Sequence, residues 1–176
     1  MGFKIASLFS GCGGLDEGFR MAGDYEVVWA NDIYLPSCRT FAKNFGLELT
    51  SDPKAFQGSI YSGDVEEVDF SSLAPRNEIE VITGGPPCQD FSIIRGPENR
   101  KGTRVKRGKL YLHFVRALVT LQPKIFVFEN VKGLISANRG RAFRQIKEDF
   151  RSLNLRWSSM LKNHSLAINN LRSTGN

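Results

Sequence analysis

The 176-residue sequence contains few cysteines and prolines and no long hydrophobic run. The three cysteines, Cys12, Cys38 and Cys88, lie far apart and form no CxxC pair, so they indicate neither a disulfide framework nor a zinc site. No stretch approaches the roughly 18 apolar residues that a membrane span needs, and the amino-terminal MGFKIASLF lacks the apolar run and cleavage region of a signal peptide. We therefore expect an intracellular, cytoplasmic protein in a reducing compartment, with no metal and no membrane partner.

Charged residues are distributed unevenly along the sequence. The overall composition, with 41% hydrophobic and 24% charged residues, is typical of one globular domain. Residues 1–90 hold 6 basic and 14 acidic side chains, whereas residues 91–176 hold 18 basic and 4 acidic ones. The densest basic segment, residues 95–109, has a single acid, Glu98. Such a segment predicts a polyanion partner such as a phosphate backbone, and a solvated loop without a partner is the alternative.

Apolar patterning predicts strands that alternate with helices. Short apolar runs predict strands over residues 5–9, 25–30, 81–83 and 125–128. Helical spacing predicts helices over residues 15–22, 36–45, 110–121 and 142–153, and a further short element opens at residues 63–65. This alternation predicts an α/β fold with a doubly wound, mostly parallel sheet. We expect one domain over residues 1–157 and leave residues 158–176 as an unassigned tail.

A glycine-rich turn, FSGCGGL at residues 9–15, follows the first predicted strand. Such a turn lets a nucleotide-like ligand approach backbone N–H groups, although a purely structural turn is the alternative. Asp16 follows at once and would disfavour a pyrophosphate, so a ligand without phosphates fits better than NAD. Asp32, 19 residues after Gly13 at the end of the second strand, is placed to bind ribose hydroxyls. Asp64 could bind the amine of an adenine or simply cap a turn.

Two further segments hold candidate catalytic side chains. TGGPPCQDFS, residues 83–92, places Cys88 on a loop stiffened by prolines at the carboxyl end of a strand, where α/β proteins place their sites. Inert packing of the cysteine is the alternative. In FVFENV, residues 126–131, Glu129 follows three apolar strand residues, where a charge is costly unless a ligand or partner group meets it. An acid that is satisfied at the end of its strand is the alternative.

These three motifs, in this order and at these separations, closely resemble those of the cytosine-5 DNA methyltransferases. The resemblance covers residues 3 to 156 approximately, and PPCQ together with ENV is its most specific part. It implies a Rossmann-like methyltransferase fold and S-adenosylmethionine as cofactor. It also implies that Cys88 is the nucleophile that adds to carbon 6 of a flipped-out cytosine and that Glu129 holds ring nitrogen 3 and the exocyclic amine.

The resemblance assigns the remaining site residues to the cofactor or to the nucleic acid. Asp32 is expected on the ribose, Ile33 against the adenine and Asp64 near the adenine amine. Ile33 stands where a bulkier aromatic is common, which reduces the expected stacking. The implied cofactor-binding residues are Phe9, Ser10, Gly11, Gly13, Gly14, Leu15, Asp32, Ile33, Asp64, Val65, Pro87 and Leu110. The implied nucleic-acid-binding residues are Gln89, Ser92, Arg95, Arg100, Lys101, Arg104, Lys106 and Arg107.

The resemblance also gives the basic segment a role, because such enzymes close a loop over double-stranded DNA at this place. Its arginines and lysines would contact phosphates while the target base leaves the stack. The family's later Gln-x-Arg-x-Arg element and target-recognition region have no match in this sequence. We therefore expect a fold that is incomplete at its carboxyl-terminal end and a chain inactive alone, arising by truncation or frameshift, as one half of a split enzyme, or as a degenerate protein.

Several alternatives stay open. A related tRNA cytosine-5 methyltransferase and a non-catalytic module binding S-adenosylmethionine or nucleic acid are the main ones, and a nicotinamide-dependent oxidoreductase is remote. A complementing second chain, self-association and a cognate restriction endonuclease are open as further partners.

Overall fold

The computed structural model describes residues 2–73, 78–87 and 110–156. It divides into two compact units, which are described separately. The first comprises Met1–Gly85 and Thr120–Glu129, and the second comprises Pro86–Val119 and Asn130–Asn176. The predicted boundary between residues 157 and 158 lies outside the described residues and stays a prediction.

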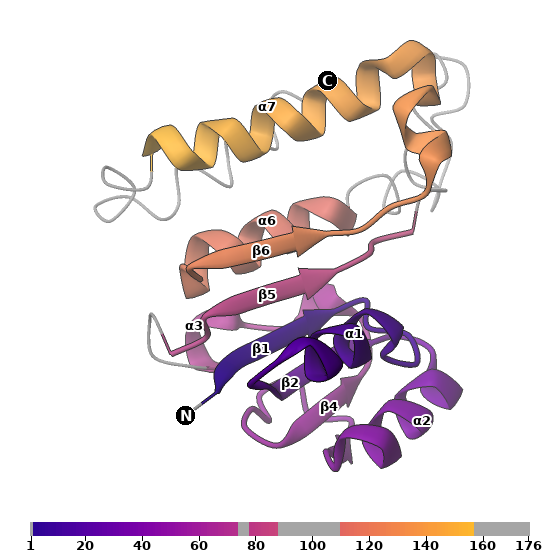
Figure 1. Cartoon of the computed structure of the whole chain (residues 1–176), viewed down its shortest axis with the longest axis vertical. Helices are drawn as coiled ribbons and strands as arrows, with labels where there is room; N and C mark the ends of the chain where they lie inside the picture. Colours follow the sequence, from indigo (N-terminus) through magenta and orange to yellow (C-terminus); the bar gives the residue numbers. More distant parts are fainter. Residues whose placement is uncertain (1, 74–77, 88–109, 157–176) are drawn as a thin grey trace. The chain divides into compact units, whose positions relative to one another are not determined.

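All six strands of the described residues belong to one sheet of the first unit (Figure 1). They are β1 (Phe3–Leu8), β2 (Tyr25–Asp32), β3 (Glu48–Thr50), β4 (Ser59–Ser62), β5 (Val81–Gly84) and β6 (Ile125–Phe128). The described helices are α1 (Gly14–Ala22), α2 (Leu35–Phe45), α3 (Phe70–Leu73), α6 (Leu110–Leu121) and α7 (Arg141–Arg156), with 3-10 turns η1 (Val65–Glu67), η3 (Lys132–Ile135) and η4 (Ala137–Gly140). The predicted strands and helices are all present, whereas β3, β4 and α3 were not predicted.

The sheet has the order β3-β4-β2-β1-β5-β6, and every strand pairing in it is parallel. From β1 the chain moves outward through β2 to β4 and β3, and it then returns to the other side of β1 to form β5 and β6. The order therefore reverses between β1 and β5, where Ser7 pairs with Thr83 and Leu8 with Gly84. The predicted fold class, a doubly wound parallel α/β sheet, is confirmed.

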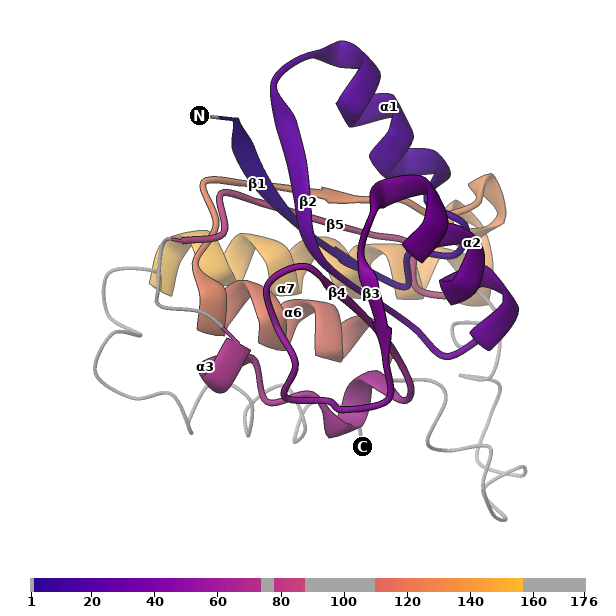
Figure 2. The same cartoon turned by 90° about the horizontal axis from the view of Figure 1, so that it is seen from below.

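A bulge in β2 determines how the core of the first unit is filled. Ile5 pairs with Val27 but Ala6 pairs with Trp29, so one residue of β2 has no partner on β1. As a result, Val27 and Ala30 enter the same core cluster, against Phe41 of α2. Figure 2 shows α1 and α2 together on one face of the sheet. Trp29, which is fully buried, instead makes an edge contact with Phe70 of α3.

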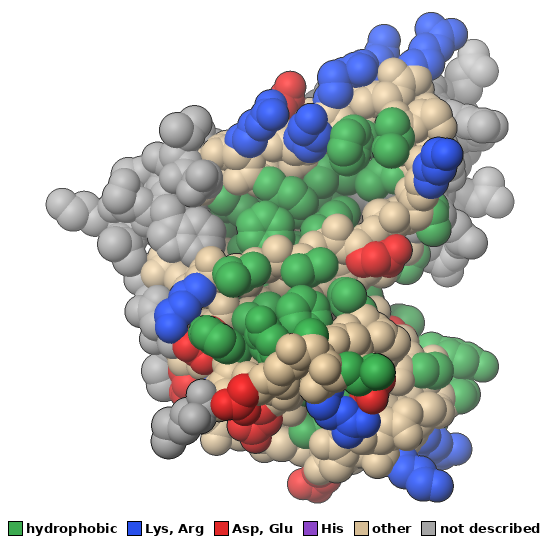
Figure 3. Space-filling view, in the orientation of Figure 1, with side chains coloured by type: hydrophobic (Ala, Val, Ile, Leu, Met, Phe, Trp, Pro, Cys, Tyr) green, Lys and Arg blue, Asp and Glu red, His purple; other side chains and the backbone are tan. Residues whose placement is uncertain are grey.

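The second unit contains the amphipathic helix α7. Its buried positions follow helical spacing, with Ala142, Ile146 and Leu153 on one side. Asp149 is also buried, and its carboxylate accepts hydrogen bonds from the Tyr111 hydroxyl and the Gln145 amide, each at 2.9 Å. Figure 3 shows basic side chains along α7. Among the described helices, none is long and apolar enough to cross a membrane.

Candidate functional site

A cavity of about 360 Å³ opens at the carboxyl ends of β1 and β5, where the strand order reverses. In open parallel sheets the two chain segments diverge at such a switch point, which leaves a crevice for a ligand. The volume lies within the usual range of pockets for small organic ligands. The cavity is lined by Ser7, Leu8, Phe9, Ser10, Leu15, Asp16, Gly84, Gly85 and Glu129.

The glycine turn forms one wall of this cavity and has an unusual backbone. Phe9, Gly11 and Gly13 have positive φ angles of 54°, 56° and 90°. Phe9 is the informative one, because a bulky residue with positive φ is strained and such strain tends to occur at functional sites. Among the described residues, none has an atom within 4 Å of a Cβ built at Gly11, so the backbone there has open space beside it.

Gly13 has a packing role that the sequence does not reveal. A Cβ at this position would collide with the rings of Phe45 and Phe41 of α2, which stack on each other with centroids 4.3 Å apart. The absence of a side chain at Gly13 therefore permits the packing of α2 against the turn, and its role in the approach of a ligand stays a prediction.

Ser10 has a buried hydroxyl without a hydrogen-bond partner among the described residues. Its backbone N–H donates to the carbonyl of Asn31, which fixes the residue after β1, and its carbonyl accepts from the N–H of Gly13. Its Oγ is buried and has no hydrogen-bond partner among the described residues. Because buried hydroxyls are normally satisfied, this atom on the cavity wall indicates a polar ligand atom.

Asp32 lies at the end of β2, as predicted, and is oriented by the backbone. One carboxylate oxygen accepts the N–H of Gly11 and the other accepts the N–H of Tyr34, each at 2.8 Å. A carboxylate has about four acceptor positions, so two remain for the hydroxyls of a ligand. Asp32 therefore holds the glycine turn and keeps acceptor positions for further donors, although it is not among the residues that line the cavity.

Asp16 lines the cavity in an environment that the sequence does not reveal. Although it lies in the first turn of α1, it is only 1% exposed. Its Oδ2 accepts from the Ser7 hydroxyl at 2.8 Å and its Oδ1 accepts from the Thr83 hydroxyl at 2.9 Å. Burial raises the pKa of Asp16 above its ordinary value, and the two hydroxyl donors oppose that shift. The carboxyl thus joins α1 to both strands at the switch point, beneath the cavity.

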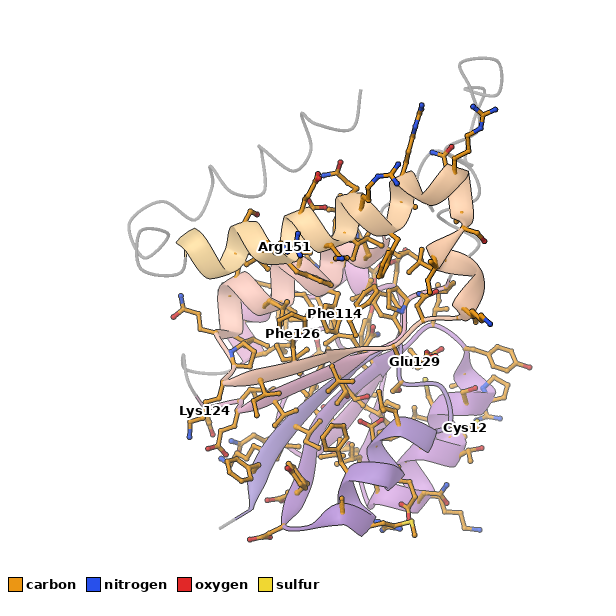
Figure 4. All side chains as sticks on the ribbon, turned by 45° about the horizontal axis from the view of Figure 1, so that its top comes forward. Cys12, Phe114, Lys124, Phe126, Glu129 and Arg151 are labelled. Atoms are coloured by element: carbon orange, nitrogen blue, oxygen red, sulfur yellow. The ribbon has the colours of Figure 1, made fainter. Side chains whose placement is uncertain are left out.

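Glu129 lies at the opposite wall, directly after β6. Its backbone N–H donates to the carbonyl of Gly84 at 2.9 Å, which fixes the residue across from β5. A Cβ on Gly85 would come within 2.7 Å of the Glu129 Oε2, so glycine at this position leaves room for the carboxylate. Figure 4 shows Glu129 at the same edge of the sheet as the glycine turn that carries Cys12.

The second unit contains the start of the predicted nucleophile loop. The side-chain amide of Asn130 donates to the carbonyl of Pro86 at 2.8 Å, and its oxygen accepts from the N–H of Val131. Asn130 therefore ties the segment before Cys88 to the segment after Glu129. Cys88 itself lies outside the described residues.

The other predicted residues are more scattered. Ile33 is 72% exposed just beyond β2, and Gly14 begins α1. Val65 is buried, and Asp64 caps η1 by accepting the N–H of Glu66, which is the alternative weighed for it. Pro87 is exposed and Leu110 begins α6, both in the second unit.

The predicted nucleic-acid contacts all lie outside the described residues: Gln89, Ser92, Arg95, Arg100, Lys101, Arg104, Lys106 and Arg107.

The charges around the cavity are of one sign. Asp16 and Glu129 line it, and no lysine, arginine or histidine of the described residues does. Such a wall disfavours the pyrophosphate of a dinucleotide and favours a ligand that carries positive charge.

Comparison with known proteins agrees with this geometry. The family model of the C-5 cytosine-specific DNA methylases matches residues 3–165. The DNA (cytosine-5-)-methyltransferase M.ApeKI of Aeropyrum pernix is 52% identical over 164 residues, which are 90% of this chain and 35% of that relative. The Type II methyltransferase M.NgoFVII of Neisseria gonorrhoeae is 44% identical over 147 residues, which are 84% of this chain and 35% of that relative. The chain thus spans about a third of the length of these two relatives.

Solved structures give the same picture. A prophage-encoded protein of Escherichia coli, described as a DNA modification methyltransferase, superposes with a TM-score of 0.55 at 31% identity, over 84% of this chain and 38% of that one. The Dnmt2 methyltransferase of S. pombe has a TM-score of 0.53 at 19% identity, over 83% of this chain and 40% of that one, and supports the fold alone.

Proposed function

This chain belongs to the C-5 cytosine-specific DNA methylase family, and from that premise we propose that it provides the cofactor-binding and catalytic part of an enzyme that methylates carbon 5 of cytosine in DNA. The observation that carries the proposal is the cavity at the switch point, which is walled by the glycine turn on one side and by Glu129 on the other. Cofactor and target cytosine would meet between these two walls.

The cavity fits S-adenosylmethionine, which supplies a methyl group on a positively charged sulfur when bound. The acidic lining suits that charge, and the buried Ser10 Oγ needs a polar partner. Asp32 would accept hydroxyls of the ribose, since its carboxylate has free acceptor positions. The exposed side chain of Ile33, directly after Asp32, would cover the adenine.

Cys88 and Glu129 are the proposed catalytic residues. The Cys88 thiolate would add to carbon 6 of the cytosine, which makes carbon 5 electron-rich enough to accept a methyl group. Glu129 would hold ring nitrogen 3 and the exocyclic amine, and it would thereby select cytosine. The absence of a side chain at Gly85 and the anchored backbone of Glu129 support this role, because they leave its carboxylate space at the edge of the cavity.

Double-stranded DNA is the proposed partner. The basic residues 95–109 follow Cys88 in the sequence and would contact phosphates while the target base is extruded. The relatives M.NgoFVII and M.BbvI are named Type II methyltransferases. These names support a cognate restriction endonuclease as a further proposed partner. The proposed location of the enzyme is the cytoplasm.

The test is a chimera, because the chain spans 35% of M.ApeKI. The chain replaces the matching part of that relative, and transfer of a labelled methyl group from S-adenosylmethionine to mixed-sequence duplex DNA is measured. We expect transfer by the chimera and none by its Cys88→Ser and Glu129→Gln variants, while Cys12→Ser is the matched control because Cys12 is exposed and does not line the cavity.

Two outcomes would contradict the proposal. Transfer that persists in the Cys88→Ser chimera would remove the nucleophile from the mechanism. Transfer to tRNA but not to duplex DNA, with both substrates offered in parallel, would favour the related RNA enzyme.

A further inference from the structure

A row of exposed basic side chains on α7 lies outside the residues assigned to the cofactor, the cytosine or the DNA. Arg141, Arg144, Lys147 and Arg151 follow one another at intervals of three or four residues, so they share one side of the helix. Together they form the basic face of α7. The buried residues of the helix lie on its other side, and Glu148 is its only exposed acid. Figure 3 shows the basic side chains along α7, and Figure 4 labels Arg151.

This face is arranged against the stability of its own helix. Neighbouring members of the row carry like charges at spacings of three or four residues, and such pairs destabilise a helix. Arg141 and Arg144 also lie at the amino-terminal end of α7, where the helix dipole favours acids and disfavours cations. The first turn contains no acid. The positions of these cations are therefore not explained by the formation of the helix.

The fold does not neutralise the basic face either. Within the described part of the chain, no carboxylate lies within ion-pair distance of its four cations, although Glu148 is on the same helix. Cations of the first unit behave differently, since Arg20 pairs with Glu17 and Lys124 with Glu80, each at 2.7 Å. A row of cations that opposes helix stability and has no carboxylate partner indicates an anion outside the chain.

We propose that the basic face of α7 binds the phosphate backbone of duplex DNA, as a second contact surface besides residues 95–109. The inference rests on the proposed function. Arginine suits this role because its planar guanidinium donates to two phosphate oxygens at once. Arg141 and Arg151 are ten residues apart, which is about 15 Å along a helix. The phosphates of one DNA strand repeat about every 3.4 Å along the duplex axis, so the face matches the length of about four phosphates.

The second unit also connects this face with the segment that leads to Cys88. The side-chain amide of Asn130, before α7, donates to the carbonyl of Pro86 at 2.8 Å, and both residues belong to the same compact unit as the helix. DNA on the basic face is therefore bound by the unit that contains the start of the Cys88 loop. Contacts to phosphates would hold the duplex there without reading its sequence.

The test measures binding of a fluorescently labelled, mixed-sequence DNA duplex to the 176-residue chain by anisotropy over a range of salt concentrations. The variant combines Arg141→Gln, Arg144→Gln and Arg151→Gln, and Lys147 is kept because its Nζ lies 5.3 Å from the ring centroid of Phe143. We expect the affinity at about 0.1 M salt to fall about ten- to hundredfold. The slope of log K against log salt should decrease by about 2–3, because each lost phosphate contact removes about one.

Two control variants separate local contacts from total charge. Arg39→Gln, Lys43→Gln and Lys54→Gln together remove the same charge from exposed positions of the first unit, and they should lower the affinity less than about threefold. Lysine in place of the three arginines of α7 keeps the charge, so most of the affinity should remain. Circular dichroism checks that each variant is folded.

A further measurement needs no substitution and decides the matter if the glutamine variant fails to fold. Phenylglyoxal modifies exposed arginines, and mass spectrometry gives the rate at each position in the unaltered chain. Bound duplex DNA should slow the modification of Arg141, Arg144 and Arg151 and leave that of Arg39 unchanged, since Arg39 is exposed in the first unit.

The contrary results are distinct. Equal losses of affinity in the α7 variant and the first-unit control, or no protection of the α7 arginines by bound DNA, would show that the basic face is only solvated. A variant that binds DNA normally but no longer self-associates would overturn the inference in favour of an acidic protein surface as partner. Absence of DNA binding by the unaltered chain at low salt would refute the DNA partner of the proposed function as well.

Discussion

Replacing Gly13 with alanine should destabilise the chain severely, because two separate costs fall on one methyl group. The backbone φ of 90° is a conformation that L side chains rarely adopt, and such strain costs roughly 1–3 kcal/mol. The new Cβ would also collide with the rings of Phe45 and Phe41, and overpacking of this kind costs roughly 1–3 kcal/mol. We therefore expect Gly13→Ala to lower the free energy of unfolding by about 2–6 kcal/mol.

Urea denaturation followed by circular dichroism measures this change, and Gly18→Ala is its control. Gly18 lies inside α1, and a Cβ there would meet no atom of the described part of the chain within 4 Å. Since alanine is favoured over glycine within a helix, Gly18→Ala should raise the free energy of unfolding by about 0.5–1 kcal/mol. If Gly13→Ala lost less than about 1 kcal/mol, the packing of α2 against the glycine turn would be wrong as described.

Three further predictions concern the acids of the two units. Gly85→Ala should lower the rate of methyl transfer in the chimera by about 10- to 100-fold while changing cofactor affinity little, because the new Cβ would displace the Glu129 carboxylate; an unchanged turnover would contradict this. Burial raises the pKa of Asp16 in the folded state, so protonation of its carboxyl stabilises the fold. This stabilisation is fully present below the ordinary pKa of 3.8, and it is lost as the pH rises through the pKa of the folded state. Asp16→Asn should therefore gain free energy of unfolding relative to the unaltered chain between pH 4 and pH 7, and a constant difference in urea titrations would refute the shift. Tyr111→Phe should cost about 1–2 kcal/mol by removing a donor from the buried Asp149, whereas a loss below 0.3 kcal/mol would show that the bond contributes nothing.

The sequence predicts those elements whose stability is local. The strand at residues 125–128 and the helix at residues 110–121 have the predicted bounds, because their apolar patterns are uninterrupted. The short strands β3 and β4 were not predicted, since their sequences, ELT and SIYS, mix polar and apolar residues and contain no uninterrupted apolar run. They form because each pairs with a parallel neighbour in the sheet, β4 with β2 and β3 with β4. The local sequence of a strand does not indicate which other strand it pairs with.

The site follows the same division. Asp32 and Glu129 were predicted from their positions at the ends of strands, where α/β proteins place their ligand-binding side chains. The burial of Asp16 was not predicted, because acids in the first turn of a helix usually face solvent. Its two partners are 9 residues before it and 67 residues after it, and only the folded sheet brings them together. The contact of Gly13 with the rings of Phe41 and Phe45 was not predicted either, because only the folded chain brings α2 against the turn.

Hydrogen–deuterium exchange with and without S-adenosylmethionine tests the central claim, that the cavity at the switch point is the cofactor site. We predict that the ligand slows exchange of the amides in residues 9–15 and 84–85 and leaves the far ends of the strands, such as Phe3 and Tyr25, unchanged. Unchanged exchange throughout residues 9–15, or slowed exchange confined to other segments, would contradict the account.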